Sequence, residues 1–206
     1  DSIFPATNAT QAAKFARVVQ AVQPDVMALQ EIYDHTASEV VALMNSLLPL
    51  SGSGTWYAYQ GFDNVLVSKY PLSMTRSTTV PNPSSTSYSI GLVDLPNDQY
   101  AKDFYFMNGH FKCCSTDGSE EIKRQQQADA LVNWMRDART PSGSVTLPTG
   151  TPMAVLGDFN VVDGPAPVNT MLTGDIVNEG TYGSDSPPDW DGSSLTDAHP
   201  FHNVTD

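Results

Sequence analysis

The sequence predicts a layered α/β fold with mixed β-sheets, and three observations lead to that prediction. Short unbroken apolar runs at residues 26–29 and 153–156 are typical of buried strands. Segments with helical apolar spacing lie beside these runs. A series of strand-like segments, separated by Pro and Ser clusters, fills the middle of the chain. Strands that alternate with helices near the ends and follow one another in the middle favour layers with both parallel and antiparallel pairs.

Two helices and one strand are predicted in the first part of the chain. Apolar spacing predicts a helix over residues 10–22, which Pro24 ends. The strand at residues 26–29 follows directly. A second helix begins after Thr36, because Thr36 and Glu39 have the spacing of a capping box.

Five further strands and a long helix are predicted in the middle of the chain. The strands are expected at residues 56–60, 64–68, 74–80, 88–95 and 104–107. The long helix is expected over residues 119–139, with Asp117 or Ser119 as its cap. Its predicted buried stripe consists of Ile122, Ala128, Leu131, Val132 and Met135.

The last part of the chain begins with the strand at residues 153–156. A short helix is predicted at residues 168–172. The tail from Asp175 is rich in Gly, Asp, Pro and Ser, which predicts an ordered loop. No internal repeat or linker interrupts the chain, so residues 1–206 are predicted to form a single domain.

Composition restricts the possible function. With 206 residues, the chain is long enough to bury one sizeable core, and no apolar run approaches the roughly 20 residues that span a bilayer. The formal net charge is −13, which disfavours a nucleic-acid scaffold because such binding depends on basic residues. A phosphoester substrate is compatible with this charge, since a bound divalent cation supplies positive charge locally. Few Lys and many Ser and Thr residues favour a secreted or extracytoplasmic protein.

The cysteines Cys113 and Cys114 are adjacent, so they cannot form a disulfide between distant parts of the fold. Three interpretations are open: two small buried apolar residues, a vicinal disulfide, or a reactive thiol. The first interpretation is favoured.

Polar groups follow three of the predicted strands. The first strand ends at Glu31, the second at Asn108 and His110, and the third at Asp158 and Asn160. Ligands of open α/β sheets bind at the carboxyl ends of strands, so these side chains are candidates for one site. Asp158 and Asn160 are two positions apart, which on a strand directs both to one side. The alternative is structural: Glu31 caps a turn, and His110 is a semi-buried histidine with its hydrogen bonds satisfied.

Several segments of the sequence resemble the endonuclease/exonuclease/phosphatase superfamily, which includes deoxyribonuclease I. The resembling segments are residues 24–31, 64–71, 108–111, 124–125 and 156–160. They occur in the order and spacing of the superfamily and span most of the chain. The resemblance implies an α/β sandwich of two mixed β-sheets flanked by helices, with terminal strands missing. The two cysteines and residues 189–192 are similar to a bacterial subgroup.

The resemblance also implies roles for individual residues. Glu31 would bind an essential Mg²⁺ (or Mn²⁺), with Asp158 as a second metal ligand. Asp158 would also activate the attacking water, and Asn160 would hold that water and a phosphate oxygen. His110 would donate a hydrogen bond to a non-bridging oxygen of the phosphate.

Two further residues are assigned by the same resemblance. Asp63 would pair with His110 and hold it protonated. Asn108 would contribute to phosphate binding, more by shaping the end of its strand than by reacting.

The sequence also departs from the superfamily pattern. It contains neither an Arg-x-Asp nor a Ser-Asp-His motif, and His199 matches the loop before the latter. The expectation is therefore a piece of a longer protein, truncated at both ends. The parent protein is predicted to hydrolyse phosphoesters with a metal ion, whereas the piece alone is predicted to be nearly inactive.

Alternative functions differ in class. The chain could keep the fold as a non-catalytic binding module, or it could be a nuclease specifically. A calcium-binding module is suggested by the acidic residues 185–197, which lack the distal Glu of a calcium loop. The sparse basic residues favour small phosphoesters or phospholipid head groups over nucleic acid as substrates. No protein partner is implied.

Overall fold

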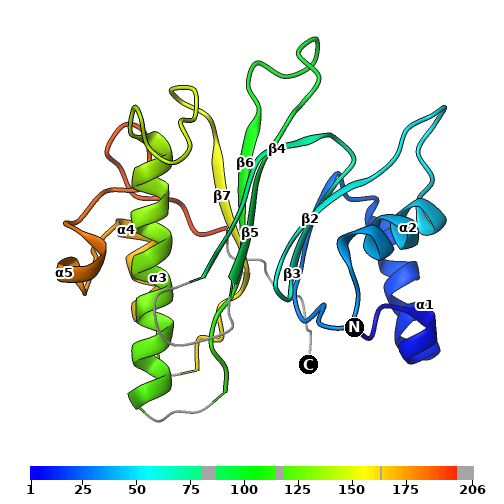
Figure 1. Ribbon diagram of the computed structural model, residues 1–206, viewed down its shortest axis with the longest axis horizontal. Helices are drawn as coiled ribbons and strands as arrows, with labels where there is room; N and C mark the ends of the chain where they lie inside the picture. Colours follow the sequence, from blue (N-terminus) through cyan, green and yellow to red (C-terminus); the bar gives the residue numbers. More distant parts are fainter. Residues whose placement is uncertain (80–86, 115–117, 163, 199–206) are drawn as a thin grey trace, which may run out of the picture. The chain divides into compact units, whose positions relative to one another are not determined.

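The computed structural model describes residues 1–79, 87–114, 118–162 and 164–198. The chain divides into two compact units, one formed by Asp1–Lys112 with Thr151–Asn160, the other by Cys113–Gly150 with Val161–Asp206. The first unit contains both β-sheets and two helices, and the second contains the remaining helices (Figure 1).

A three-stranded sheet of the first unit consists of β1 (Val26–Leu29), β3 (Asn64–Ser68) and β2 (Tyr57–Gly61), in that order. Both of its strand pairs are antiparallel. The central strand β3 is buried at every residue, whereas β1 is half-buried. Residues 26–29 are therefore a strand as predicted, but the expectation of full burial is wrong because β1 lies at an edge of the sheet among the described residues.

A four-stranded sheet has the order β4-β5-β6-β7. Its strands are β4 (Leu72–Thr79), β5 (Ser87–Val93), β6 (Phe104–His110) and β7 (Met153–Asp158). The pairs β4–β5 and β5–β6 are antiparallel, and the pair β6–β7 is parallel. β7 is only half-buried and becomes exposed at its end, again because it is the last strand of the described sheet.

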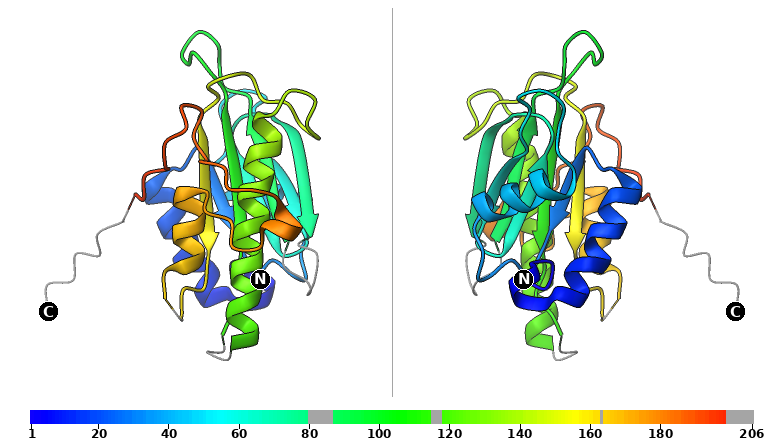
Figure 2. Two further views of the ribbon diagram at one scale, coloured as in Figure 1. Left: turned by 90° about the vertical axis from the view of Figure 1, so that its left-hand side faces the viewer. Right: turned by 90° about the vertical axis from the view of Figure 1, so that its right-hand side faces the viewer.

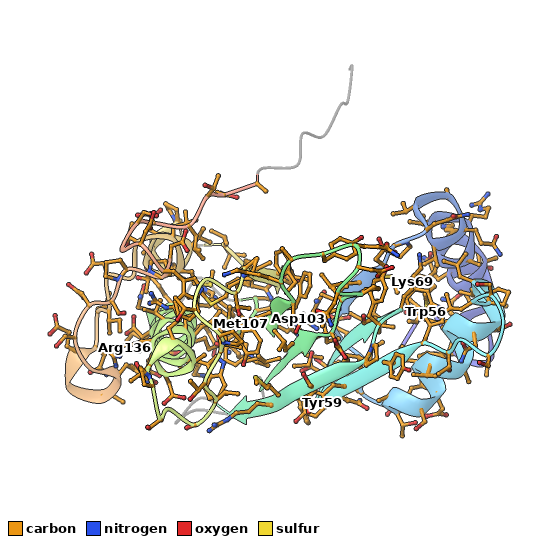
Figure 3. All side chains as sticks on the ribbon, turned by 90° about the horizontal axis from the view of Figure 1, so that it is seen from above. Trp56, Tyr59, Lys69, Asp103, Met107 and Arg136 are labelled. Carbon is orange, nitrogen blue, oxygen red and sulfur yellow. A yellow bond between two sulfur atoms is a disulfide. The ribbon has the colours of Figure 1, made fainter. Side chains whose placement is uncertain are left out.

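The two sheets pack against each other, since β2 and β3 contact strands of the four-stranded sheet. Helix α2 (Ala37–Leu47) packs against β2 and β3, and α1 (Pro5–Val22) contacts α2. The predicted capping box of Thr36 and Glu39 is confirmed, with both reciprocal hydrogen bonds present. The core between helices and sheet consists of Phe4, Val19, Ile32, Val40, Met44, Trp56, Val65 and Val67. At its margin, the ammonium group of Lys69 lies 5.8 Å from the ring centroid of Trp56 (Figure 3).

The second unit is built around α3 (Gly118–Arg139), which contacts α4 (Ala166–Thr173) and α5 (Glu179–Tyr182). Figure 2 shows these helices from two opposite sides. Arg136 and Arg139 donate hydrogen bonds to backbone carbonyl groups of residues 182–189, which fixes this part of the tail on α3. The tail was predicted to be loop throughout, and α5 is a short exception.

The predicted stripe of α3 is correct at four of its five positions. Ala128, Leu131, Val132 and Met135 are fully buried, but Ile122 is 59% exposed and was wrongly assigned. The helix begins at Gly118, so Ser119 lies inside it and is not its cap. The alternative cap Asp117 and the residue His199 lie outside the described residues.

The favoured interpretation of the cysteines is wrong. Cys113 and Cys114 form a vicinal disulfide, and Cys114 is exposed rather than part of a core. In the parts of the chain that the structure describes, no helix is long and apolar enough to cross a membrane. The predicted α/β class with two sheets and flanking helices is confirmed, with one sheet mixed and the other antiparallel.

Candidate active site

Strand pairing brings the predicted site residues to one end of the packed sheets in the first unit. In the antiparallel pair β1–β3, Leu29 lies opposite Val65, so the end of β1 meets the start of β3. In the parallel pair β6–β7, His110 lies opposite Asp158. The ends of β1, β6 and β7 and the start of β3 thus carry the polar side chains.

His110 and Asp63 form a buried pair. The Nδ1 atom of His110 lies 2.6 Å from Oδ2 of Asp63, and both side chains are almost fully buried. The other carboxylate oxygen of Asp63 accepts a hydrogen bond from the Asn64 side chain at 3.2 Å. An ionised carboxylate can only accept, so Nδ1 of His110 carries the hydrogen, and Nε2 is the nitrogen left for other contacts.

The pKa of His110 is raised above its ordinary value. The hydrogen bond to Asp63 is the largest cause, and burial partly opposes it. The negative charges of Asp63, Asp158 and Glu31 raise the pKa further. The imidazole therefore holds its proton to a higher pH than a free histidine does. All three carboxylates favour its charged form.

Asn108 joins the two sheets through its buried side-chain amide. Its oxygen accepts a hydrogen bond from Gln30 Nε2 at 2.6 Å. Its nitrogen donates to Ser89 Oγ at 3.1 Å and to the carbonyl oxygens of Leu29 and Val65, at 3.1 and 3.3 Å. These partners lie on or beside β1, β3 and β5, so one side chain fixes three strands relative to β6.

Asp158 and Asn160 are held by a turn and not by strand alternation. β7 ends at Asp158, and Asn160 has a left-handed backbone with φ of 46°. The backbone N–H of Asn160 donates to Oδ1 of Asp158 at 3.0 Å, and its side-chain nitrogen donates to the carbonyl oxygen of Phe111 at 2.9 Å. The expectation that both side chains project from one side of a strand is therefore wrong, although both residues lie at the same end of the sheet.

Gly157 permits the close approach of β7 to β6 just before Asp158. Its φ of 143° lies outside the range that other residues adopt readily, and an added Cβ would collide with the carbonyl oxygen of Gly109. A glycine is thus required at this position to set the backbone that carries Asp158.

Glu31 follows β1 with an exposed side chain and a left-handed backbone, φ of 61°. Its carbonyl oxygen accepts a hydrogen bond from the amino terminus of Asp1 at 2.6 Å. Its carboxylate makes no hydrogen bond or ion pair within the described residues and is open to a ligand. A non-glycine residue in this region costs energy, and such residues cluster at active sites and ligand-binding sites.

No group of three or more His, Cys, Asp or Glu residues that could hold a metal ion occurs among the described residues. Glu31 and Asp158 are nevertheless exposed carboxylates whose charges reach the same imidazole. Mg²⁺ keeps several of its waters and binds through one or two carboxylates, so this donor set fits such an ion.

Two glutamines support the site and were not predicted as site residues. Gln30 contacts Asn108, and Gln60 donates from its Nε2 atom to three carbonyl oxygens at the loops after β1 and β2. Gln30 could have been found from its place beside Glu31. Gln60 gives no such signal, because its contacts exist only once the two loops are together.

The comparison with family profiles identifies the chain. The profile of the Endonuclease/Exonuclease/phosphatase family matches residues 4–203. The chain belongs to this family. Members of the Endonuclease/Exonuclease/phosphatase family are hydrolases that act on phosphoester bonds. Comparison with curated proteins gives no match.

Solved structures of other proteins share the fold of this chain. TDP2 from C. elegans matches with a TM-score of 0.54 and 19% identity, over 79% of this chain and 46% of that one. ANGEL2, a 2′,3′-cyclic phosphatase, matches with a TM-score of 0.56 and 16% identity, over 79% and 47% of the two chains. A mannosyl-6-phosphatase from Bacteroides thetaiotaomicron matches with a TM-score of 0.54 and 14% identity, over 77% and 61%. The chain thus spans about half of the first two proteins, and the deoxyribonuclease-I-like fold is confirmed.

Proposed function

We propose that the protein to which this chain belongs is a metal-dependent phosphoesterase that hydrolyses its substrate with an activated water. The observation that carries the proposal is the His110–Asp63 pair, 2.6 Å apart, within the field of Asp158 and Glu31. A protonated imidazole beside carboxylates of this kind suits the hydrolysis of a phosphoester, and membership of a family of phosphoester hydrolases supports that chemistry.

We assign His110 the role of hydrogen-bond donor to a non-bridging phosphate oxygen. Asp63 occupies Nδ1 and fixes the tautomer, so that Nε2 of the imidazolium is the donor to substrate. The donated proton stabilises negative charge that builds up on the phosphate oxygens in the transition state. Asp63 is a positioning residue in this scheme.

We assign Asp158 the role of general base for the attacking water. One of its oxygens is used by the backbone of Asn160, which fixes the orientation of the carboxylate. Asn160 is itself fixed by Phe111 through its side-chain nitrogen, so its oxygen is available to hold the water. Its contact with a phosphate oxygen belongs to the same proposal.

We assign Glu31 the role of principal metal ligand, with Asp158 as a second ligand. The family generally uses divalent metal ions, and the exposed carboxylates fit Mg²⁺ (or Mn²⁺). The chemistry that a bound ion would supply is polarisation of the phosphoryl group and neutralisation of charge on the leaving oxygen. Asn108, fully buried and engaged by four partners, contributes to phosphate binding only by holding the strands that carry these residues.

The substrate class that we propose is a small phosphoester or a phospholipid head group. The net charge of −13 opposes a duplex-binding surface. The alternative, a nuclease, is kept because one similar structure is that of D. rerio TDP2 complexed with a single-strand DNA product. We further infer that both compact units belong to one domain, which the family match across residues 4–203 supports.

The test is hydrolysis of bis-p-nitrophenyl phosphate by the full-length protein with Mg²⁺, with EDTA, and after His110→Gln. Hydrolysis should require the metal ion and should fall by roughly two to four orders of magnitude in the variant. Metal-independent hydrolysis, or full activity of the variant, would contradict the proposal. The 206-residue chain alone is expected to be nearly inactive, since its sequence lacks the Arg-x-Asp and Ser-Asp-His motifs.

A binding module with the same fold would give a different result. It would bind phosphoester ligands without hydrolysing any member of a panel of DNA, sphingomyelin, inositol phosphates and generic diesters. Mg²⁺-dependent turnover of one member excludes that alternative and names the substrate class.

A further inference from the structure

Two exposed aromatic side chains contact each other beside the candidate active site. Tyr33 is 54% exposed and Phe62 is 57% exposed. Their ring centroids are 5.9 Å apart with an interplanar angle of 75°, which is an edge-to-face contact. Large aromatic rings are usually covered, so an exposed pair in mutual contact indicates a surface that binds something.

Tyr33 and Phe62 are next to residues of the candidate active site in the sequence. Tyr33 lies two residues after Glu31, and Phe62 lies immediately before Asp63. The backbone N–H of Ile32, the residue before Tyr33, donates a hydrogen bond to the carbonyl oxygen of Asp63, the residue after Phe62. Both rings therefore lie beside the turn that carries the partner of His110.

The two loops that carry the rings are joined before any ligand binds. The side-chain nitrogen of Gln60 donates to the carbonyl oxygens of Ile32, His35 and Phe62, at 3.2, 3.0 and 3.1 Å. The backbone N–H of Ile32 donates to the carbonyl oxygen of Asp63 at 2.9 Å. Loops that are already joined lose little conformational freedom when a ligand binds to the rings they carry, which favours affinity.

The backbone of Phe62 adds a further argument. Its φ of 51° is in the left-handed region, which is unfavourable for a bulky residue. Asn or Gly would fit this turn between β2 and β3 at lower cost, and burial does not compensate for the choice of Phe. The side chain is thus not explained by the local fold, whereas a role in ligand binding explains it.

We propose that Tyr33 and Phe62 form a platform that binds a planar aromatic ring of the substrate, as in a nucleotide, beside the phosphate position. The inference rests on the proposed phosphoesterase function and narrows its substrates to phosphoesters that carry such a ring. Stacking of a base on an aromatic side chain contributes without hydrogen-bond recognition, so the platform accepts different bases. Such a platform suits a protein with a net charge of −13, because stacking on an aromatic ring does not require basic residues.

The test compares two ligands that differ only in the base, adenosine 5′-monophosphate and ribose 5-phosphate. Calorimetric titrations of the full-length protein are run with Mg²⁺ and with EDTA, the latter to exclude turnover. The wild-type protein should bind the nucleotide about tenfold more tightly than the sugar phosphate, as expected for one stacked base. In the double variant Tyr33→Leu/Phe62→Leu, this preference should be lost, while the affinity for ribose 5-phosphate is unchanged.

The matched control is Tyr57→Leu, which removes an exposed tyrosine at the opposite end of β2 and should leave the preference intact. Equal affinity of the wild-type protein for both ligands, or an unchanged preference in the double variant, would overturn the inference. The outcome is independent of hydrolysis: a base preference in a protein without Mg²⁺-dependent activity contradicts only the proposed function.

Discussion

The imidazole of His110 and the carboxylate of Asp63 are 2.6 Å apart, although 47 positions separate them in the sequence. Asp63 lies in the turn just before β3 of one sheet, and His110 is the last residue of β6 in the other. Their contact links the start of β3 to the end of β6. The pair therefore has two effects, since it fixes a tautomer and also joins the two sheets where the polar side chains gather.

Replacement of Asp63 by Asn should lower the pKa of His110. The change removes the negative charge and the strongest acceptor of the imidazole while keeping the size of the side chain. Burial, which favours the neutral imidazole and lowers the pKa of His110, is then no longer offset by Asp63. Titration of His110 by NMR in the presence of EDTA measures the change. Asp25→Asn, which alters an exposed carboxylate paired with Lys69, is the control. If His110 titrates identically in the wild-type protein and in Asp63→Asn, then Asp63 is not what raises the pKa of His110.

The stability of the protein should depend on pH through the same pair. The pKa of His110 is raised in the folded state. The contribution of the His110–Asp63 pair to the free energy of unfolding is therefore fully present below the pKa of a histidine in the unfolded chain, about 6.5. The effect is lost as the pH rises through the folded-state pKa. Urea unfolding of the wild-type protein and of Asp63→Asn should therefore give a difference that shrinks as the pH increases above about 6.5. If the difference in the free energy of unfolding between the two proteins grows as the pH rises above about 6.5, the pKa of His110 is not raised in the folded state.

Asn108→Ala should destabilise the protein by about 3 kcal/mol, because it leaves partners on or beside three strands without their hydrogen bonds, and two of them, Val65 and Ser89, are buried. Denaturant unfolding measures the loss. Asn97→Ala, at an exposed loop position, is the control and should change stability by less than about 0.5 kcal/mol. Equal effects of both variants would mean that the amide of Asn108 does not hold the sheets together.

Gly157→Ala should destabilise the protein by about 2 kcal/mol or more. The added Cβ meets the carbonyl oxygen of Gly109, and the backbone has a φ of 143° that alanine adopts at a cost. The phosphoesterase activity that we propose should fall as well, since Asp158 is the next residue. Gly118→Ala, where nothing lies within 4 Å of an added Cβ, is the matched control. Wild-type stability of Gly157→Ala would contradict the close approach of β6 and β7.

Local signals in the sequence predicted much of the fold. The apolar runs at β1 and β3 gave both strands with their observed bounds, and the spacing of Thr36 and Glu39 gave the start of α2. These predictions succeed because strand pattern and helix capping depend on neighbouring residues. Burial depends on the order of strands in the sheet, which explains why β1 and β7 are less buried than their composition indicates.

The site was predictable as a set of residues but not as a geometry. The resemblance named Asp63 as the partner of His110, and the contact is present. The turn that holds Asn160 could not be predicted from a two-residue spacing, because a left-handed residue interrupts the strand pattern. The contacts of Gln60 and Asn108 join segments distant in sequence, and a polar residue gives no local sign of such partners.

The parallel pairing of β6 and β7 has a consequence for the order in which the molecule is made. The segment between these two strands contains the whole of α3, so β7 leaves the ribosome only after that helix. The chain is synthesised from its amino terminus, and contacts between distant segments form late because a long loop must close first. The pair of His110 and Asp63 is complete in the earlier part of the chain, whereas Asp158 arrives last. Both residues of the His110–Asp63 pair therefore leave the ribosome before the carboxylate of Asp158 does.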